Sequence, residues 1–242
     1  MEIMHFTDGI NPRVLEESLK LAISEAPAMV GQHIDSESPL LPLAEAEVGI
    51  LLGGSLRMVG AGARQEFNGV MCDLKVGVIA AIDDEAEVPR LAGFIQYKPR
   101  LLTEGVASIG YAAVVEQYRG QGVFKQMLEE LKSKYTVISL DCPLELVPFY
   151  EKLGFHADNI QHAHVGMSNG PLSGITWMQD QEYLENQKPY QQAKAAVRDK
   201  LGKRTAEAYA KRDADTRKRV GEIKDLLAER GVVSADRAQQ PA

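Results

Sequence analysis

The sequence contains few cysteines and no long apolar stretch. Cys72 and Cys142 are the only cysteines in 242 residues, so we expect no disulfide framework and a reducing compartment, the cytoplasm. No apolar run reaches the roughly 18 residues that a membrane span needs, and the first ten residues lack the basic start and apolar core of a signal peptide. These absences argue against a disulfide-stabilised secreted protein and against a membrane protein.

Charge is unevenly distributed along the chain. The net charge is −7, but residues 188–242 contain 14 Lys and Arg against 8 Asp and Glu, while the remainder contains 13 against 26. The acidic body repels nucleic acid and favours a cationic substrate. In the basic tail, acidic residues are interleaved and only Tyr190 and Tyr209 are aromatic. This pattern favours a solvated helix, or a helix that packs on another subunit, over a nucleic-acid-binding segment.

Strand-like and helix-like patterns are mixed over the first 180 residues, which predicts a mixed α/β (α+β) domain. The first helix should begin with Asn11 as its cap and Pro12 in its first turn. A second helix should end near Gly53 and Gly54. The predicted strands cover residues 2–6, 71–83, 90–98, 106–115, 136–142, 155–160 and 173–179, and the predicted helices 11–26, 42–56, 121–135 and 144–153.

A charged helical extension is expected after this domain. Residues 189–230 are polar and alanine-rich, which predicts one or two exposed helices broken near Gly202 and Asp213. The last dozen residues should be frayed. We therefore divide the chain into a domain at 1–180 and an extension at 181–242.

A glycine-rich turn between a predicted strand and a predicted helix forms a candidate anion site. Gly120 and Gly122 precede the helix, and Arg119 adds a cation. The first backbone N–H groups of a helix have no internal partner, and glycine lets a phosphate approach them closely. The turn lacks the Lys-Ser/Thr of a P-loop and the three-glycine spacing of a dinucleotide fingerprint. A tight strand-to-helix connection without a ligand is the alternative.

The stretch VVEQYRGQGVFKQML around this turn resembles the acyl-CoA-binding motif of the GNAT N-acyltransferase superfamily. Gln117, Gly120 and Gly122 occupy the positions of its Gln/Arg-x-x-Gly-x-Gly/Ala pattern. The resemblance implies that acetyl-CoA is the cosubstrate and that backbone amides of the turn bind its pyrophosphate. The amides so assigned belong to Arg119, Gly120, Gln121, Gly122, Val123 and Phe124.

A second stretch, DCPLELVPFYEKLGFH, resembles the helix that precedes the last strands of GNAT enzymes. Residues 142–156 are especially similar to arylalkylamine N-acetyltransferases, but the two histidines of that subgroup are replaced by Ile109 and Tyr111. The resemblance to the subgroup is therefore local. Together the two motifs imply a central twisted, mostly antiparallel sheet that is splayed at the CoA site.

The same resemblance implies catalytic roles for particular residues. Tyr150 would protonate the leaving thiolate, because a phenol of pKa about 10 can give a proton to sulfur. The backbone of Ala113, Val114 and Val115 would pair with the pantetheine arm. Tyr111 contacts substrate or relays a proton, or is simply part of the core. Asp141 is the nearest acidic candidate for a base, with a turn or cap residue as the alternative.

The resemblance implies an N-acetyltransferase that joins acetyl-CoA and a primary amine in a ternary complex. The acidic body favours a small cationic acceptor, and a protein amine stays open. A non-catalytic CoA-binding module that acts through its basic tail is the alternative. We expect no metal, because no Cys or carboxylate at ligand spacing joins His162 and His164. A homodimer through the C-terminal helices is a further expectation.

Overall fold

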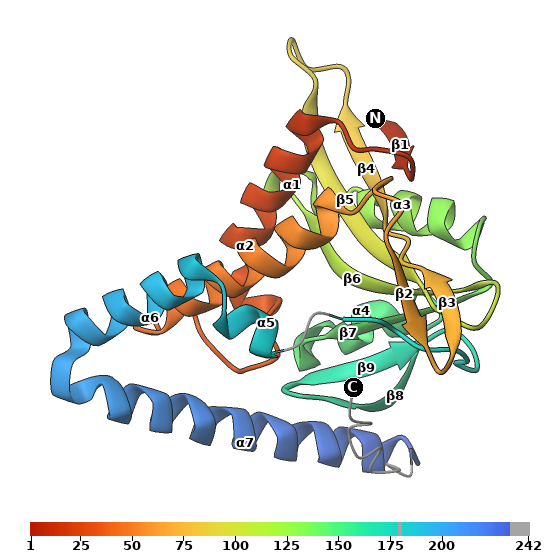
Figure 1. Ribbon diagram of the computed structural model, residues 1–242. Helices are drawn as coiled ribbons and strands as arrows, with labels where there is room; N and C mark the ends of the chain where they lie inside the picture. The colour runs from red at the N-terminus through yellow and green to blue at the C-terminus, as the bar shows by residue number, and fades with distance from the viewer. Residues whose placement is uncertain (179–180, 233–242) are drawn as a thin grey trace.

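The computed structural model describes residues 1–178 and 181–232, and its centre is a sheet with helices on both faces (Figure 1). The strands are β1 (Glu2–Phe6), β2 (Arg64–Phe67), β3 (Val70–Asp73), β4 (Gly77–Asp83), β5 (Arg90–Pro99), β6 (Val106–Val114), β7 (Val137–Cys142), β8 (His156–Gln161) and β9 (His164–Ser168). The helices are α1 (Pro12–Ser24), α2 (Leu41–Arg57), α3 (Val123–Lys132), α4 (Val147–Glu151), α5 (Gln181–Glu185), α6 (Lys188–Leu201) and α7 (Thr205–Glu229).

The seven-stranded sheet has the order β1-β4-β5-β6-β7-β9-β8, and β2 and β3 form a separate hairpin. Every neighbouring pair in the large sheet is antiparallel except β6 and β7, which run parallel. This arrangement confirms the mixed fold class and the mostly antiparallel sheet. The parallel pair requires a crossover, and α3 provides it.

Two hydrophobic cores lie on opposite faces of the sheet. One is formed by α1, α2 and α6 against one face, and the other by α3, α4 and the end of α7 against the opposite face. Helix α1 begins as expected, because the Asn11 side chain accepts a hydrogen bond of 2.9 Å from the Arg13 N–H and Pro12 is the first helical residue. The two faces therefore meet only where the sheet opens.

Helix α2 does not end at Gly53 and Gly54 but continues to Arg57. Both glycines are buried, and a side-chain carbon at Gly53 would lie 3.7 Å from Leu19 of α1. Gly53 thus lies where α2 contacts α1, and the helix continues past both glycines to Arg57. A sequence pattern cannot distinguish this use of glycine from a helix stop.

Two predicted strands are wrong. The stretch 71–83 is divided into β3 and β4, and β3 pairs with β2, which the sequence analysis missed. Over 173–178 the chain is irregular, with one bridge from Ile175 to Leu101, while the last strand of the sheet is β9. Gln179 lies outside the described residues. The sequence analysis did not predict β9, because the polar residues of this strand do not indicate that it is buried.

The C-terminal extension packs on its own chain. Tyr190 and Val197 of α6 are buried on the α1–α2 side, and Ile223 and Leu227 of α7 are buried beside β8. Helix α6 leads away from the sheet and α7 runs back beneath β8 (Figure 1). A break at Gly202 is confirmed, whereas α7 passes through Asp213 without interruption. Residues 233–242, predicted to be frayed, lie outside the described residues.

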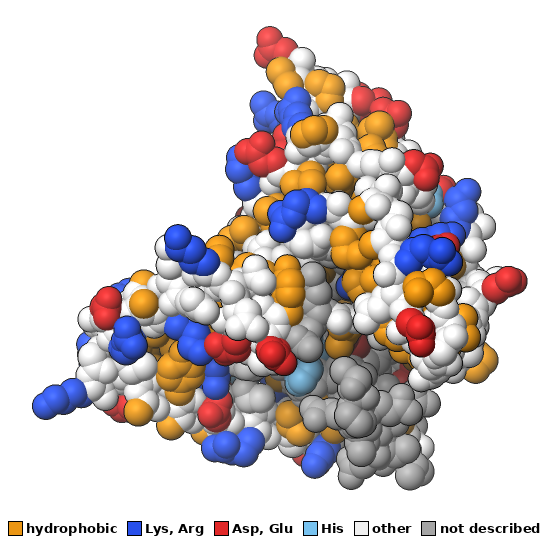
Figure 2. All heavy atoms as spheres, in the orientation of Figure 1, with side chains coloured by type: hydrophobic (Ala, Val, Ile, Leu, Met, Phe, Trp, Pro, Cys, Tyr) orange, Lys and Arg blue, Asp and Glu red, His pale blue; other side chains and the backbone are white. Residues whose placement is uncertain are grey.

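Basic and acidic side chains alternate over the face of the molecule that Figure 2 shows, including the α6–α7 arm. Arg219 of α7 pairs with Glu145 at 2.7 Å, and Arg230 pairs with Glu151 at 2.6 Å. These ion pairs neutralise part of the positive charge of the extension. Within 1–178 and 181–232, no helix combines the length and apolar character needed to cross a bilayer.

Removal of the Leu227 side chain should destabilise the whole domain. Leu227 is 1% exposed, so Leu227→Ala should lower the free energy of unfolding by about 2–5 kcal/mol through lost burial and a cavity. The exposed neighbour Lys224 provides the control, since Lys224→Ala should change stability by less than about 0.5 kcal/mol. Urea unfolding followed by circular dichroism measures both. Equal stability of the two variants would show that α7 is not part of the folded unit.

Candidate active site

Strands β6 and β7 separate after three residue pairs. Their parallel pairing covers Val106 to Ser108 on β6 and Val137 to Ser139 on β7. Beyond Ser108, β6 stays paired with β5, while β7 continues beside β9. A bulge at Gly110 accompanies the separation, because Ile109 pairs with Tyr97 and Tyr111 with Gln96. The sheet therefore opens into a wedge-shaped gap along one side of β6.

The register of β6 decides which backbone groups face this gap. The Val115 N–H donates to Ala92 O on the β5 side, whereas Val114 O accepts a hydrogen bond from the Arg119 guanidinium. Successive residues of a strand direct their backbone groups to opposite edges. Ala112 and Val114 therefore face the gap, while Ala113 and Val115 face β5. This corrects the assignment of Ala113 and Val115 to a pantetheine arm.

The turn at Gly120 and Gly122 presents free amides at the start of α3. Both glycines have positive φ, 76° and 79°, and a side chain at either would meet no protein atom. Gly122 is the N-cap of α3 and has no side-chain cap. In the described part of the chain, no backbone acceptor is found for the amides of Gly120, Gln121, Gly122, Val123 and Phe124. They form an open concave cluster of donors suited to an anion.

The Arg119 amide differs from its neighbours, because it donates to Glu116 O at 3.0 Å. Its guanidinium is also occupied, by Glu25 at 2.5 Å and by Val114 O at 2.9 Å. The Gln121 side chain donates to Gln117 O at 2.7 Å. These contacts hold the turn against α1 and β6. Any anion at the turn is therefore bound mainly by main-chain groups and the helix dipole.

Tyr150 lies on the α3–α4 side of the gap. Its ring contacts Phe124, Phe149 and Phe155 at centroid distances of 5.7, 5.2 and 5.9 Å. Burial raises the pKa of Tyr150 above its ordinary value, so the phenol keeps its proton at neutral pH. Its hydroxyl makes no hydrogen bond with any described residue, and the side chain lines the cavity. Tyr150 is thus an oriented proton donor without a protein acceptor.

Cys142 is close to Tyr150 but is chemically inert. The thiol is 1% exposed, lies 3.5 Å from the Met167 sulfur, and burial raises its pKa to about 12. A thiol that stays protonated at neutral pH is a poor nucleophile. The cysteine therefore serves packing, as the sequence suggested.

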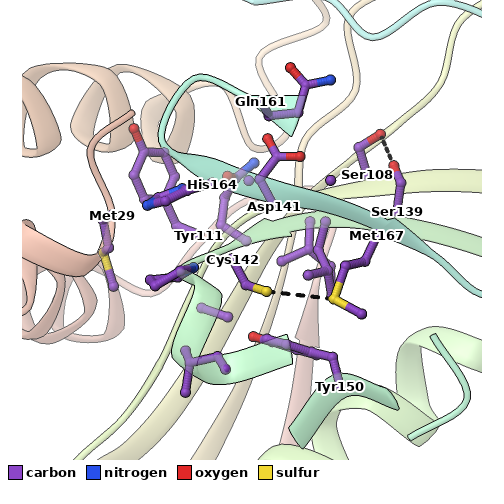
Figure 3. A pocket seen from close by; sticks show the side chains of 18 of the residues that line it. Met29, Ser108, Tyr111, Ser139, Asp141, Cys142, Tyr150, Gln161, His164 and Met167 are labelled. Atoms are coloured by element: carbon purple, nitrogen blue, oxygen red, sulfur yellow. Dashed lines mark hydrogen bonds between the residues drawn. The ribbon is translucent and has the colours of Figure 1, made fainter. Parts of the chain in front are cut away.

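Asp141 lies across the sheet from Tyr150. Figure 3 shows Asp141, His164 and Tyr111 together on one side of β7, and the Tyr150 ring on the other. The Asp141 side chain opens onto the cavity, yet the surrounding protein displaces bulk water and raises its pKa to about 6. Desolvation also raises the pKa of Tyr111 and lowers that of His164 to about 4. At neutral pH, Asp141 is thus the charged member of this group.

One cavity of about 1570 Å³ connects these features, from the Gly120–Gly122 turn through the gap to Trp177. Tyr111, Asp141 and Tyr150, the three catalytic candidates from the sequence, all line this cavity. It also contains Glu47 of α2 and Gln96 and Lys98 of β5, which the sequence analysis did not identify. No motif could have revealed them, because they lie on two elements, α2 and β5, that are far apart in the sequence. In the described ranges, no three metal-ligating side chains cluster.

Comparison with known proteins agrees with this geometry. Residues 75–157 match the family model described as Acetyltransferase (GNAT) domain. A comparison with curated proteins finds no match.

Several solved structures are similar to the chain. An acyl-CoA N-acyltransferase from Pseudomonas aeruginosa has 15% identity over 70% of this chain and 100% of its own, with a TM-score of 0.43. Gcn5 of Tetrahymena has 8% identity over 69% and 94%, with a TM-score of 0.44. The NatC complex bound to Gag peptide and CoA has 18% identity over 72% and 100%, also with 0.44. Residues 75–157 of the chain are thus similar to the GNAT acetyltransferase domain.

Proposed function

We propose that this protein is an N-acetyltransferase that moves an acetyl group from acetyl-CoA to a primary amine in a ternary complex. The observation that carries the proposal is the single cavity that joins the free amides after Gly120, the gap beside β6, and two acid–base groups on opposite faces. A direct transfer needs this arrangement, since the two substrates must meet inside the sheet.

The residues around the gap fit acetyl-CoA. The amides from Gly120 to Phe124 would bind its pyrophosphate, and the backbone of Ala112 and Val114 would pair with the pantetheine arm. An N–H of the same strand would donate to the oxyanion that forms at the thioester carbonyl. The splayed backbone thus supplies donors that the sheet itself does not use.

Two side chains would move protons. Asp141, ionised above about pH 6, would accept a proton from the acceptor ammonium, directly or through water. Tyr150, held protonated by burial, would give its proton to the departing thiolate. At neutral pH each side chain is already in the protonation state that its role requires, with Asp141 ionised and Tyr150 protonated. A non-catalytic CoA-binding module would not need these groups, and an assay of thiol release with an amine panel separates the two functions.

The glycine turn is tested by Gly122→Ala. The methyl group would project into the open space in front of the amides, and the φ of 79° would strain alanine by about 1–2 kcal/mol. We expect CoA affinity to fall at least tenfold in isothermal titration calorimetry. Gly221→Ala on α7, where no atom lies nearby, should bind CoA normally. Equal affinity of Gly122→Ala and wild type would remove the turn from the binding site.

Tyr150→Phe tests the proton donor. The change keeps the ring contacts and removes the hydroxyl, so kcat should fall at least tenfold with little change in acetyl-CoA affinity. Tyr209→Phe on α7 is the control and should keep full turnover. Steady-state thiol release and calorimetry provide the two readouts. Unchanged turnover in Tyr150→Phe would exclude the tyrosine from the mechanism.

Asp141→Asn tests the base through its pH dependence. Because desolvation raises the pKa of Asp141 to about 6, the wild type loses the base as pH falls through 6, whereas the asparagine variant has no base at any pH. The ratio of wild-type to variant kcat/KM should therefore be large at pH 7–8 and shrink below pH 6. Use of this ratio cancels the titration of the amine. A ratio independent of pH would contradict the assignment.

A further inference from the structure

Lys98 is a half-buried cation that lines the cavity and has no acidic partner among the described residues. Lys98 extends from β5 on the α2 side of the sheet, and within the described ranges no carboxylate lies within 4.0 Å of its ammonium. The ammonium lies 3.9 Å from the centre of the Trp177 ring and 3.5 Å from Trp177 O. Burial lowers the pKa of Lys98 to about 8, so at pH 7 it is mostly charged. A desolvated charge of this kind is costly unless an anion pairs with it.

Two neutral polar groups near Lys98 also lack partners. Gln96 is 0% exposed and neither atom of its amide makes a hydrogen bond in the described structure. Trp177 is 6% exposed and its indole N–H is likewise unpaired. Both residues line the cavity. Buried polar groups are nearly always hydrogen-bonded, so each of these unpaired groups destabilises the free protein. Two unpaired donors beside an ammonium that has only a long hydrogen bond to Trp177 O indicate a missing acceptor.

Two of the acidic groups that line the cavity, Asp141 and Glu47, are near Tyr111. Asp141 of β7 lies beside Tyr111 in Figure 3. Glu47 of α2 lines the same cavity, and burial raises the pKa of its carboxyl, with Arg212 opposing the shift. The strand register places Lys98 opposite Ser108, at the closed end of the gap, whereas Gln96 is opposite Tyr111. The part of the cavity on the α2 side of the sheet therefore has acidic groups near Tyr111 and a cation, Lys98, at the closed end of the gap.

We propose that the acceptor is a primary amine that also carries a carboxylate, with the amine at Asp141 and the carboxylate at Lys98, Trp177 and Gln96. This inference rests on the proposed function and specifies its substrate class. It differs from the small cationic acceptor that the net charge of the body suggested, because a second ammonium on such an acceptor would meet Lys98. The local charge of a buried pocket outweighs the distant charges that solvent screens.

A carboxylate fits this wall better than a phosphate group. Lys98 supplies one positive charge, and the two other donors are neutral. The nearby Arg100 donates to Ser173 O, Gly174 O and Thr176 Oγ1, at 2.7, 2.8 and 2.7 Å. Its guanidinium is thus already committed to the chain after β9. A monoanion matches one ammonium, and a phosphate dianion would leave excess negative charge in a desolvated site.

A panel of matched acceptors tests the inference with the full-length enzyme and acetyl-CoA. Each acid is compared with the amine that lacks its carboxylate: phenylalanine with phenethylamine, lysine with cadaverine, 4-aminobutanoate with propylamine, and 6-aminohexanoate with pentylamine. We expect the best substrate to be an acid, with kcat/KM at least tenfold above that of its partner. A best substrate without a carboxylate, or a ratio below tenfold, overturns the inference.

Two variants locate the carboxylate. Lys98→Met keeps the length of the side chain and removes its charge, so the acid-to-amine ratio should fall to about one. Trp177→Phe keeps an aromatic ring and removes the N–H, so it should lower the acid-to-amine ratio at least threefold. This variant tests the proposed carboxylate site if Lys98→Met fails to fold. The exposed Lys75 supplies the control, since Lys75→Met should leave the ratio unchanged. An unchanged ratio in folded Lys98→Met or in Trp177→Phe contradicts the proposed site.

Calorimetry separates failure of this inference from failure of the proposed function. If the wild type binds no CoA, the proposed function is wrong. If it binds CoA but turns over none of the panel, each acid and amine is titrated into the enzyme–CoA complex. Acids that bind at least tenfold more tightly than their partners, with the difference lost in Lys98→Met, support the inference. Acids that bind no better than the amines overturn it.

Discussion

The separation of β6 from β7 is the constraint on which the rest of the site depends. Hydrogen bonds between strands satisfy the backbone, so a sheet that opens in its interior leaves donors and acceptors unpaired. Here the pairing stops at Ser108, and the backbone of Ala112 and Val114 faces a gap. A ligand with amides of its own can complete this pairing. The free amides at Gly122 continue the same surface, and the cavity follows it from end to end.

Desolvation gives the groups around the gap their different chemical roles. It holds Tyr150 and Cys142 protonated, keeps His164 neutral, and moves Asp141 toward the middle of the pH range. Burial raises the pKa of the carboxyl, phenol and thiol groups but lowers the pKa of the imidazole, because burial always disfavours the charged form. The charged form is the deprotonated one in the first three groups and the protonated one in an imidazole. Desolvation thus leaves a protonated phenol on one face of the sheet and, at neutral pH, an ionised carboxylate on the other.

Much of the fold could be predicted from local patterns, and the failures have identifiable causes. The cap at Asn11, the turn before α3 and the helix that contains Tyr150 depend on residues close in sequence. The strand expected at 173–179 does not form over residues 173–178, and the place beside β7 is taken by β9. Gly53 continues a helix, since a partner helix packs closely against it. Such outcomes depend on long-range contacts that local patterns do not contain.

The sequence by itself determined the glycine turn, the tyrosine and their order along the chain, because each is a local motif with its own backbone preference. Only the tertiary structure decided which amides of β6 face the gap and which residues form the far wall. Gln96 and Lys98 are two residues apart on β5 and share one face, but nothing in the sequence marks Trp177 as their neighbour. The register of β5 on β6 and the path of the chain after β9 bring them together. Burial then makes their missing partners significant, because an unpaired polar group costs little in water and much inside a protein.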